Sequence, residues 1–221
     1  MIQAVFVDLL HLFNDPHGIF AMSAVLRQHG VRVSFIGTRN HDAALAQVRR
    51  LRPDLLLYSA FSATIPAYIK FDRRVKQALP VTSLIGGPGP TYDWPRLRDS
   101  TIDAVCLGEG EQALVEFIKS GFQYSRNIIR PADDRPGTFY PLVDLNQLPF
   151  PDREPVYRVD SLLRNSPSKQ FLSGRGCPFA CTYCFNHRFR EMFRGCGPTI
   201  RKKTVDYLLA EIKDVQGRYP L

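Results

Sequence analysis

The stretch DLLLYSAFSATIPAYIKFDRRVKQAL, residues 54–79, contains the repeating unit on which the fold depends. It opens with an apolar run (54–60), continues through small residues (59–64), and then shows helical spacing of apolar residues (65–79). An apolar run without polar alternation is typical of a strand buried on both faces of a parallel sheet. The stretch therefore predicts a strand, a loop and a helix in succession.

The same unit recurs along the first half of the chain. Further helices are predicted near residues 17–29, 41–51, 94–98 and 111–119, and further strands at 4–10, 31–37, 81–87 and 103–108. Strands that alternate with helices imply a parallel sheet with helices on both faces. We predict a flavodoxin-like, doubly wound α/β domain with a five-stranded parallel sheet over residues 1–121.

Small residues follow three of the predicted strands, at 59–64, 86–91 and 108–111. In open parallel sheets, ligands bind at the carboxyl ends of the strands. Glycines there let the backbone approach a bulky ligand, and hydroxyl groups can bond its polar edge. No G-x-G-x-x-G follows the first strand, which argues against a dinucleotide site.

The remainder of the chain changes character after residue 121. Residues 122–167 are rich in proline and show little helical periodicity, which predicts a linker that crosses a surface. Residues 168–174 predict a strand, and Arg201-Lys202-Lys203 is expected to open a helix. Thr204 is a candidate N-cap for a helix over 205–216, with Val205, Leu208, Leu209 and Ile212 on one apolar face.

Three cysteines lie within eight residues of the stretch SGRGCPFACTYCFN (173–186), at Cys177, Cys181 and Cys184. Three thiols cannot all pair as disulfides, and a closed zinc site needs a fourth ligand, for which His187 and Cys196 are the local candidates. A four-iron cluster also prefers four thiolates, so three would leave one iron open. The C-x3-C-x2-C spacing is not that of a zinc knuckle and favours the cluster.

This motif, with Tyr183 just before the last cysteine, resembles that of the radical S-adenosylmethionine superfamily. The resemblance implies that Cys177, Cys181 and Cys184 hold a [4Fe–4S] cluster and that S-adenosylmethionine chelates the fourth iron. It also implies that Tyr183 lies against the adenine, and that an electron donor such as flavodoxin or ferredoxin reduces the cluster. Cleavage of S-adenosylmethionine would then release a 5′-deoxyadenosyl radical. Residues 168–221 would form the start of the radical S-adenosylmethionine domain, a partial (β/α) barrel.

The first part of the chain resembles the cobalamin-binding domain that often precedes such a domain. The resemblance rests on residues 18–30, 59–64, 84–91 and 107–111. LPFPDR (148–153) resembles the hinge that joins the cobalamin-binding domain to the radical S-adenosylmethionine domain in these proteins. The resemblance implies a groove for the nucleotide tail of cobalamin. The residues that would line this groove are Ser59, Ser62, Thr64, Gly86, Gly87, Thr91, Gly108, Glu109 and Glu111.

One motif departs from the cobalamin pattern. Asp15-Pro16-His17 begins a D-x-H-x-x-G sequence, whose histidine can ligate cobalt, but Phe20 occupies the glycine position. We favour a role for His17 at the start of a helix over ligation of cobalt.

Together the two resemblances imply a cobalamin-dependent radical S-adenosylmethionine enzyme, or its N-terminal portion. The implied reaction is methyl transfer to an unactivated carbon of an unknown small-molecule substrate. The alternative is a non-catalytic corrinoid-binding module that acts as a carrier or sensor. Because little sequence follows the cysteines, we expect a truncated catalytic domain that is inactive alone.

Composition and charge limit the partners and the cellular location that we expect for the protein. The 221 residues carry a net charge of +8, but the basic residues are scattered and lack interleaved aromatics, so nucleic-acid binding is not favoured. The N-terminus does not resemble a signal peptide, and no stretch is long enough for a membrane span. We expect a cytoplasmic protein with reduced thiols, in which Cys106 is a buried apolar residue and Cys196 a spare thiol.

Overall fold

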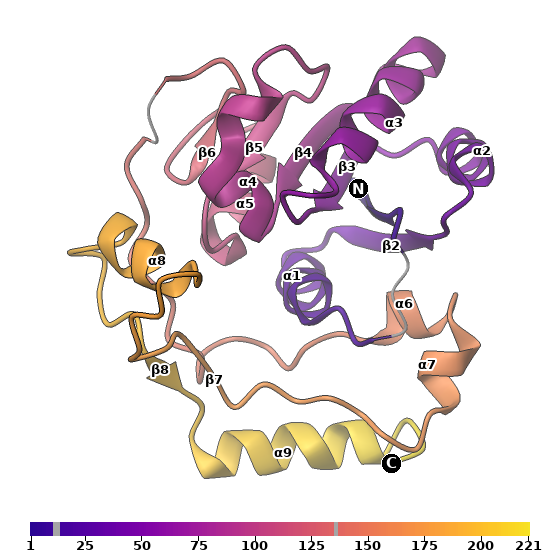
Figure 1. Ribbon diagram of the computed structural model, residues 1–221. Coiled ribbons are helices and arrows are strands. Elements are labelled where there is room, and N and C mark those ends of the chain that lie inside the picture. Colours follow the sequence, from indigo (N-terminus) through magenta and orange to yellow (C-terminus); the bar gives the residue numbers. More distant parts are fainter. Residues whose placement is uncertain (11–13, 135–136) are drawn as a thin grey trace.

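The computed structural model describes residues 1–10, 14–134 and 137–221. At its centre lies a six-stranded sheet with the order β2-β1-β3-β4-β5-β6 (Figure 1). Its strands are β1 (Gln3–Asp8), β2 (Arg32–Gly37), β3 (Leu55–Ser59), β4 (Thr82–Gly86), β5 (Ala104–Cys106) and β6 (Ile128–Ile129). The first five run parallel, and β6 pairs antiparallel with β5.

The order in which strands are added to the sheet reverses at β1. Phe6 pairs with Phe35 of β2 on one side and with Leu57 of β3 on the other. From β1 the chain adds β2 on one side and then β3, β4 and β5 on the other, which creates a topological switch point. Such a point opens a crevice at the carboxyl ends of the strands.

Helices cover both faces of the sheet, as the sequence predicts. Helices α1 (His17–Gln28) and α5 (Glu111–Lys119) pack on one face, and α2 (His41–Leu51) and α3 (Ile65–Ala78) pack on the other. Alternate residues of β1 point to the two cores, with Phe6 in the first and Val5 in the second. The doubly wound α/β fold is confirmed.

Two local predictions for the sheet domain need correction. Residues 128–129, expected in a linker, form β6, because both isoleucines are buried against β5 at the sheet edge. The glycine-rich stretch after β4 is not only a loop. It contains helix α4 (Pro88–Asp93), followed by a 3₁₀ helix (Trp94–Leu97). Proline suits the first turn of a helix, where its missing N–H has no partner to lose.

The proline-rich segment also packs more deeply than a surface linker would. It contains two short helices, α6 (Glu154–Tyr157) and α7 (Ser161–Asn165). Val156 and Tyr157 are buried in the core beneath α1, where the Tyr157 ring meets Phe20 edge to face. Arg153 is fully buried, because the carboxylate of Asp15 pairs with it at 2.6 Å.

The C-terminal part is built around a second, two-stranded sheet. The strand expected at 168–174 is reduced to β7 (Gly174–Arg175), which pairs antiparallel with β8 (Arg201–Lys202). Helix α8 (Asn186–Met192) follows the cysteines and was not anticipated. Residues 201–203 open no helix, and helix α9 (Val205–Gln216) begins after them.

Helix α9 has the predicted bounds but buries only part of the predicted face. The Thr204 hydroxyl accepts a hydrogen bond from the Tyr207 N–H at 3.2 Å, which confirms the predicted cap. Glu211 and Val215 are buried, whereas Val205 is 73% exposed and Leu209 is 50% exposed. Leu208 and Ile212 are half-buried on the same side, so the predicted apolar face is wrong for Val205 and Leu209 only. Lys203 pairs with the Glu211 carboxylate on the inward side of the helix.

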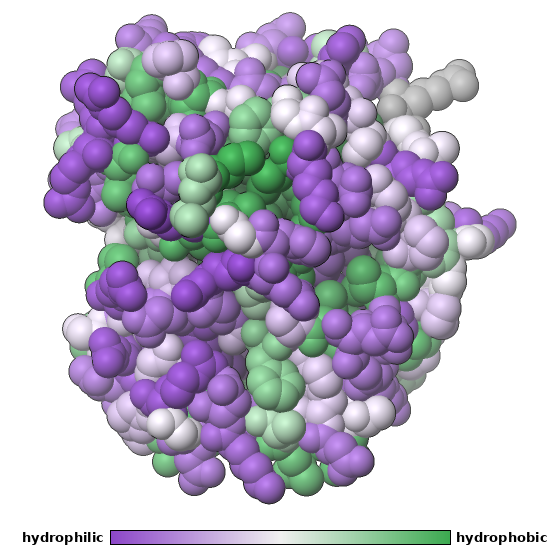
Figure 2. All heavy atoms as spheres, turned by 180° about the vertical axis from the view of Figure 1, so that it is seen from behind, coloured by the Kyte–Doolittle hydropathy of each residue, from purple (hydrophilic) through white to green (hydrophobic). Residues whose placement is uncertain are grey.

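The outer surface is mostly polar. Figure 2 shows the back of the molecule, where hydrophilic residues cover most of the face and hydrophobic residues gather in the middle of its upper half. No helix within residues 1–10, 14–134 and 137–221 is long and apolar enough to cross a lipid bilayer.

Candidate functional site

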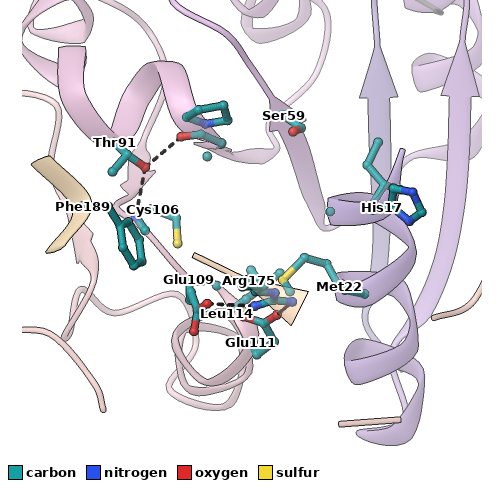
Figure 3. A pocket seen from close by; sticks show the side chains of 18 of the residues that line it. His17, Met22, Ser59, Thr91, Cys106, Glu109, Glu111, Leu114, Arg175 and Phe189 are labelled. Atoms are coloured by element: carbon teal, nitrogen blue, oxygen red, sulfur yellow. Dashed lines mark hydrogen bonds and ion pairs between the residues drawn. The ribbon is translucent and has the colours of Figure 1, made fainter. Parts of the chain in front are cut away.

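A cavity of about 510 Å³ opens at the carboxyl ends of the parallel strands (Figure 3). One wall is the sheet, which contributes Phe6, Leu57 and Leu84. The opposite wall is formed by α1 and α5, through residues that include Met22 and Leu114. The cavity therefore lies at the switch point between β1 and β3, where the topology predicts a ligand site.

Most of the residues predicted to line a groove do line this cavity. Ser62 and Thr64 do not, and Tyr183, which was expected against the adenine and not in the groove, also lies outside the cavity. The Thr64 hydroxyl caps its own loop, accepting from the Phe61 N–H at 3.1 Å, and the Tyr183 side chain is 92% exposed. The predicted residues that line the cavity are Ser59, Gly86, Gly87, Thr91, Gly108, Glu109 and Glu111.

The loops after β4 and β5 are joined beside the cavity by Thr91. Its hydroxyl donates to the Gly87 carbonyl at 2.8 Å and accepts from the Gly108 N–H at 3.0 Å. Gly87 has a φ of +100°, and a Cβ there would lie 2.9 Å from the Ala60 carbonyl oxygen. Thr91 and Gly87 thus fix the cavity wall through the backbone.

Two carboxylates of the LGEGE motif meet two arginines from the β7–β8 sheet. Glu109 accepts from Arg175 at 3.0 Å and from Arg201 at 2.5 Å, and Glu111 accepts from Arg175 at 2.5 Å. Burial opposes ionisation of Glu109, but hydrogen bonds from Arg201 and the nearby charge of Arg175 outweigh it and lower the pKa of Glu109. Arg175 belongs to the RGC sequence just before the first cysteine, so two motifs found separately in the sequence are in direct contact.

The loop after β1 is tied to the hinge-like segment by buried polar contacts. Asp15 accepts from Arg153 at 2.6 Å, from the Tyr157 hydroxyl at 2.8 Å and from the Gln170 N–H at 3.0 Å. Sequence reasoning noted Asp15 only as part of the D-x-H start. Arg153 and Tyr157 were missed as its partners, because Arg153 stands between Asp152 and Glu154 in the sequence and so gives no signal of a distant acidic partner.

His17 is the first residue of α1 and lines the cavity, which agrees with its expected place at a helix start. Burial and the neighbouring Arg153 lower the pKa of His17. Its side chain is therefore held in the neutral form near neutral pH. That His17 does not ligate cobalt stays a prediction.

The cysteine loop lies next to the mouth of the cavity. Phe185, Asn186 and Phe189 of the segment that follows Cys184 line the cavity, and the Phe185 ring lies 5.5 Å from that of Tyr92 in α4. The loop is therefore placed to face whatever the cavity binds.

The loop itself is held by a residue that sequence reasoning missed. The Arg190 guanidinium donates to the carbonyls of Cys177, Pro178 and Phe179 at 3.3, 2.7 and 3.2 Å. Arg190 lies two turns beyond the last cysteine, and its spacing gave no signal for this role. It orders the first part of the loop through the backbone.

All three cysteines of the motif are free thiols. The Cys184 N–H donates to the Cys181 carbonyl at 3.0 Å, and the Asn186 amide donates to the Cys184 sulfur at 3.4 Å. Over the described ranges of the chain, no three His, Cys, Asp or Glu side chains are gathered closely enough to hold a metal ion. The donor atoms suit a cluster, but they are not gathered around one point.

Cys106 is buried, as predicted, and its side chain lines the cavity floor. Burial, with a smaller effect of the Glu111 carboxylate, raises the pKa of the Cys106 thiol to about 12. The thiol therefore stays protonated at neutral pH and cannot act as a thiolate ligand or nucleophile there.

Curated proteins resemble the chain at low identity. It is 25% identical over 210 residues to the anaerobic magnesium-protoporphyrin IX monomethyl ester cyclase of Rubrivivax gelatinosus, a match over 82% of this chain and 36% of that protein. It is 25% identical over 188 residues to the hopanoid C-3 methylase of Methylococcus capsulatus, over 77% of this chain and 35% of that protein. The chain thus spans about a third of the length of these relatives.

Solved structures share the fold. The radical S-adenosylmethionine methyltransferase TsrM from Kitasatospora setae, with cobalamin and a [4Fe–4S] cluster bound, matches 99% of this chain and 47% of its own, with a TM-score of 0.67 at 16% identity. The cobalamin-dependent S-adenosylmethionine radical enzyme OxsB matches 99% of this chain and 32% of its own, with a TM-score of 0.73 at 16% identity.

The family model described as "B12 binding domain" matches residues 6–118, which is about half of the chain. These residues run from β1 to α5 and include the sheet wall of the cavity and the glycine-rich loops that frame it. By this match, and with the fold and the site geometry described above, the chain belongs to the B12-binding domain family.

Proposed function

We propose that the cavity binds cobalamin, with the nucleotide tail of the cofactor inserted between the sheet and helices α1 and α5. One observation carries the proposal: a largely apolar cavity lies at the carboxyl ends of parallel strands within a B12-binding domain. The apolar wall of Phe6, Leu57 and Leu84 suits a flat aromatic base. Gly87 lines the cavity and has no side chain, so its backbone is open to a ligand there.

We further propose that Cys177, Cys181 and Cys184 hold a [4Fe–4S] cluster to which S-adenosylmethionine binds. The support is the free state of the three thiols, their spacing, and the printed contents of the TsrM structure, which holds cobalamin and a [4Fe–4S] cluster. When bound and reduced, the cluster would supply the electron that cleaves S-adenosylmethionine. Because the thiols are not gathered beforehand, we expect the loop to close around the cluster as it binds.

The chain's own residues would position these groups. Arg190 holds the carbonyls of the first cysteine turn, and Arg175 fixes the preceding strand to Glu109 and Glu111. Phe185 and Phe189 at the cavity mouth would exclude water from the space between cofactor and loop. The exposed Tyr183 ring is free to lie against the adenine.

The proposed reaction class is methyl transfer to an unactivated carbon of a small molecule. One relative is named as a methylase and one structural neighbour as a methyltransferase, whereas another relative is named as a cyclase. An electron donor such as flavodoxin or ferredoxin would reduce the cluster.

A second candidate function is a corrinoid-binding module that acts as a carrier or sensor. It is favoured by one observation: the B12-binding family model matches residues 6–118 and ends before the cysteines. In this reading, the cavity would bind cobalamin and the cysteines would take no part.

Anaerobic reconstitution with iron, sulfide and hydroxocobalamin tests these proposals. We expect bound cobalamin together with iron and sulfide, and we expect that the Cys177→Ala/Cys181→Ala/Cys184→Ala variant loses the iron and keeps the cobalamin. Cys196→Ala, a free cysteine outside the motif, is the matched control and should keep both. Cobalamin without iron in the unaltered protein would favour the module, and no cobalamin would refute the proposed function.

A further inference from the structure

We propose that Arg190 is a positioning residue that raises the reduction potential of the [4Fe–4S] cluster. Its guanidinium would hold the first cysteine turn in place, and its positive charge would favour the reduced, more negative cluster. The inference rests on the proposed cluster at Cys177, Cys181 and Cys184. It adds a residue that is no iron ligand but acts on the cluster through the loop and through charge.

The starting observation is a contact between one side chain and three successive carbonyl groups. Nη1 of Arg190 donates to the Cys177 carbonyl at 3.3 Å and to the Pro178 carbonyl at 2.7 Å. Nη2 of Arg190 donates to the Phe179 carbonyl at 3.2 Å. A planar guanidinium can hold several acceptors at once, because its donors form a rigid fork. The turn that begins at the first cysteine is therefore fixed relative to helix α8.

Helix α8 gives Arg190 a firm base. Phe193, directly after the helix, is fully buried, and its ring centroid lies 4.4 Å from that of Phe189 and 4.4 Å from that of Phe139. A Cβ at Gly108 would lie 2.0 Å from the Phe193 ring, so this ring fills the space that the glycine leaves open. Arg190 therefore ties the cysteine turn to the sheet domain through an anchored helix.

The charge of Arg190 is not cancelled by an acidic partner. Its guanidinium contacts neutral carbonyls, and no carboxylate in the described part of the chain forms an ion pair with it. Arginine stays protonated at all pH values at which the protein is folded. Reduction adds one negative charge to a cluster, and nearby charge is one of the factors that set cluster potentials. A fixed cation behind the first cysteine turn should therefore stabilise the reduced form.

Arg190→Lys and Arg190→Gln separate the effect of the clamp from the effect of the charge. Lysine keeps the charge without the planar fork, whereas glutamine has neither. In both variants the reconstituted cluster should lose iron to EDTA about 10-fold faster, because groups that orient metal ligands affect how tightly the metal is held. Only Arg190→Gln should lower the ratio of reduced to oxidised cluster at a fixed potential, by about 10-fold, which is about 59 mV for one electron.

Anaerobic redox titration, followed by the electron spin resonance of the reduced cluster, measures this ratio. Arg194→Gln is the matched control, because Arg194 lines the same surface groove and carries the same charge. Its side chain is exposed and donates to none of the three carbonyls. Water and salt screen exposed charges, so Arg194→Gln should change the ratio and the rate of iron loss by less than about 2-fold.

Three results would overturn the inference: an unchanged potential in Arg190→Gln, an equal shift in Arg194→Gln, or an equal shift in Arg190→Lys. The second result would assign the effect to overall charge, and the third would show that the charge of Arg190 is not its cause. If the unaltered protein took up no iron, the proposed cluster itself would fail. A cluster with the same potential in every variant would refute only the role of Arg190.

Discussion

Glu109 couples the sheet domain to the cysteine segment through charge. Its carboxylate receives both Arg175 and Arg201, which come from strands β7 and β8 far along the chain. Removing one member of such a buried set leaves an uncompensated charge, which costs about 3–5 kcal/mol of stability. A residue that the sequence suggests for ligand binding therefore also holds two parts of the molecule together.

The pKa of Glu109 predicts how stability depends on pH. Because its folded pKa lies below the ordinary value of 4.5, its contribution is fully present above pH 4.5 and is lost as the pH falls through the folded pKa. Glu109→Gln should lower the free energy of unfolding at pH 7 and should flatten its fall below pH 4.5. Urea unfolding of both proteins between pH 3 and pH 7 would measure this, and parallel curves for the two would contradict it.

Gly87 is one of the positions where glycine is required. Its φ of +100° is strained for other residues, and a Cβ would also meet the Ala60 backbone at 2.9 Å. Gly87→Ala should cost about 1–3 kcal/mol more than Gly30→Ala, since Gly30 has a φ of +76° but open space around its Cα. Chemical unfolding measures the loss of stability in both variants. Equal losses would contradict the prediction, because they would show that the contact with the Ala60 backbone adds nothing to the strain of positive φ.

At the scale of elements, the repeated strand–loop–helix pattern predicted the fold well. Helices α2, α5 and α9 have the predicted bounds, because apolar spacing and caps such as Thr204 are local signals. Strand β6 and the short helices α6 and α7 escaped prediction, because two to five residues carry too little periodicity.

The candidate site was predictable to a similar degree. The strand ends marked most of the cavity wall, since parallel strands bring their carboxyl ends to one edge. Thr64 and Tyr183 lie outside the cavity. The Thr64 hydroxyl bonds within its own loop and the Tyr183 ring is exposed, and the spacing of residues in the sequence predicts neither. The pairing of Arg175 and Arg201 with the LGEGE carboxylates depends on contacts some 64 to 92 residues apart, which no local signal reveals.

The cap of α9 gives an element-level prediction. The Thr204 hydroxyl satisfies one of the free N–H groups at the helix start, so Thr204→Ala should lower stability by about 1 kcal/mol. Thr204→Ser retains the hydroxyl and should lose much less. Thermal or urea unfolding compares the three proteins, and similar losses in both variants would contradict a capping role.

At the scale of the whole molecule, the sheet domain and the later segments share one core. Val156 and Tyr157 of α6 and Val215 of α9 pack into the same cluster as Phe6 and Phe20 of the sheet side. The cavity lies where these parts meet, between the strand ends and the segment that follows the cysteines. A ligand in the cavity should therefore stabilise the whole chain, because binding to the folded state alone raises its stability.

Titration of cobalamin into a cavity-filling variant tests whether the cavity binds cobalamin. Ala21 of α1 lines the cavity, whereas Ala46 of α2 is an exposed alanine on a helix covering the other face of the sheet. We expect the unaltered protein and Ala46→Trp to bind hydroxocobalamin alike. Ala21→Trp, folded to the same degree by circular dichroism, should lose at least about 10-fold in affinity. Equal affinity in all three proteins would show that cobalamin does not bind in this cavity.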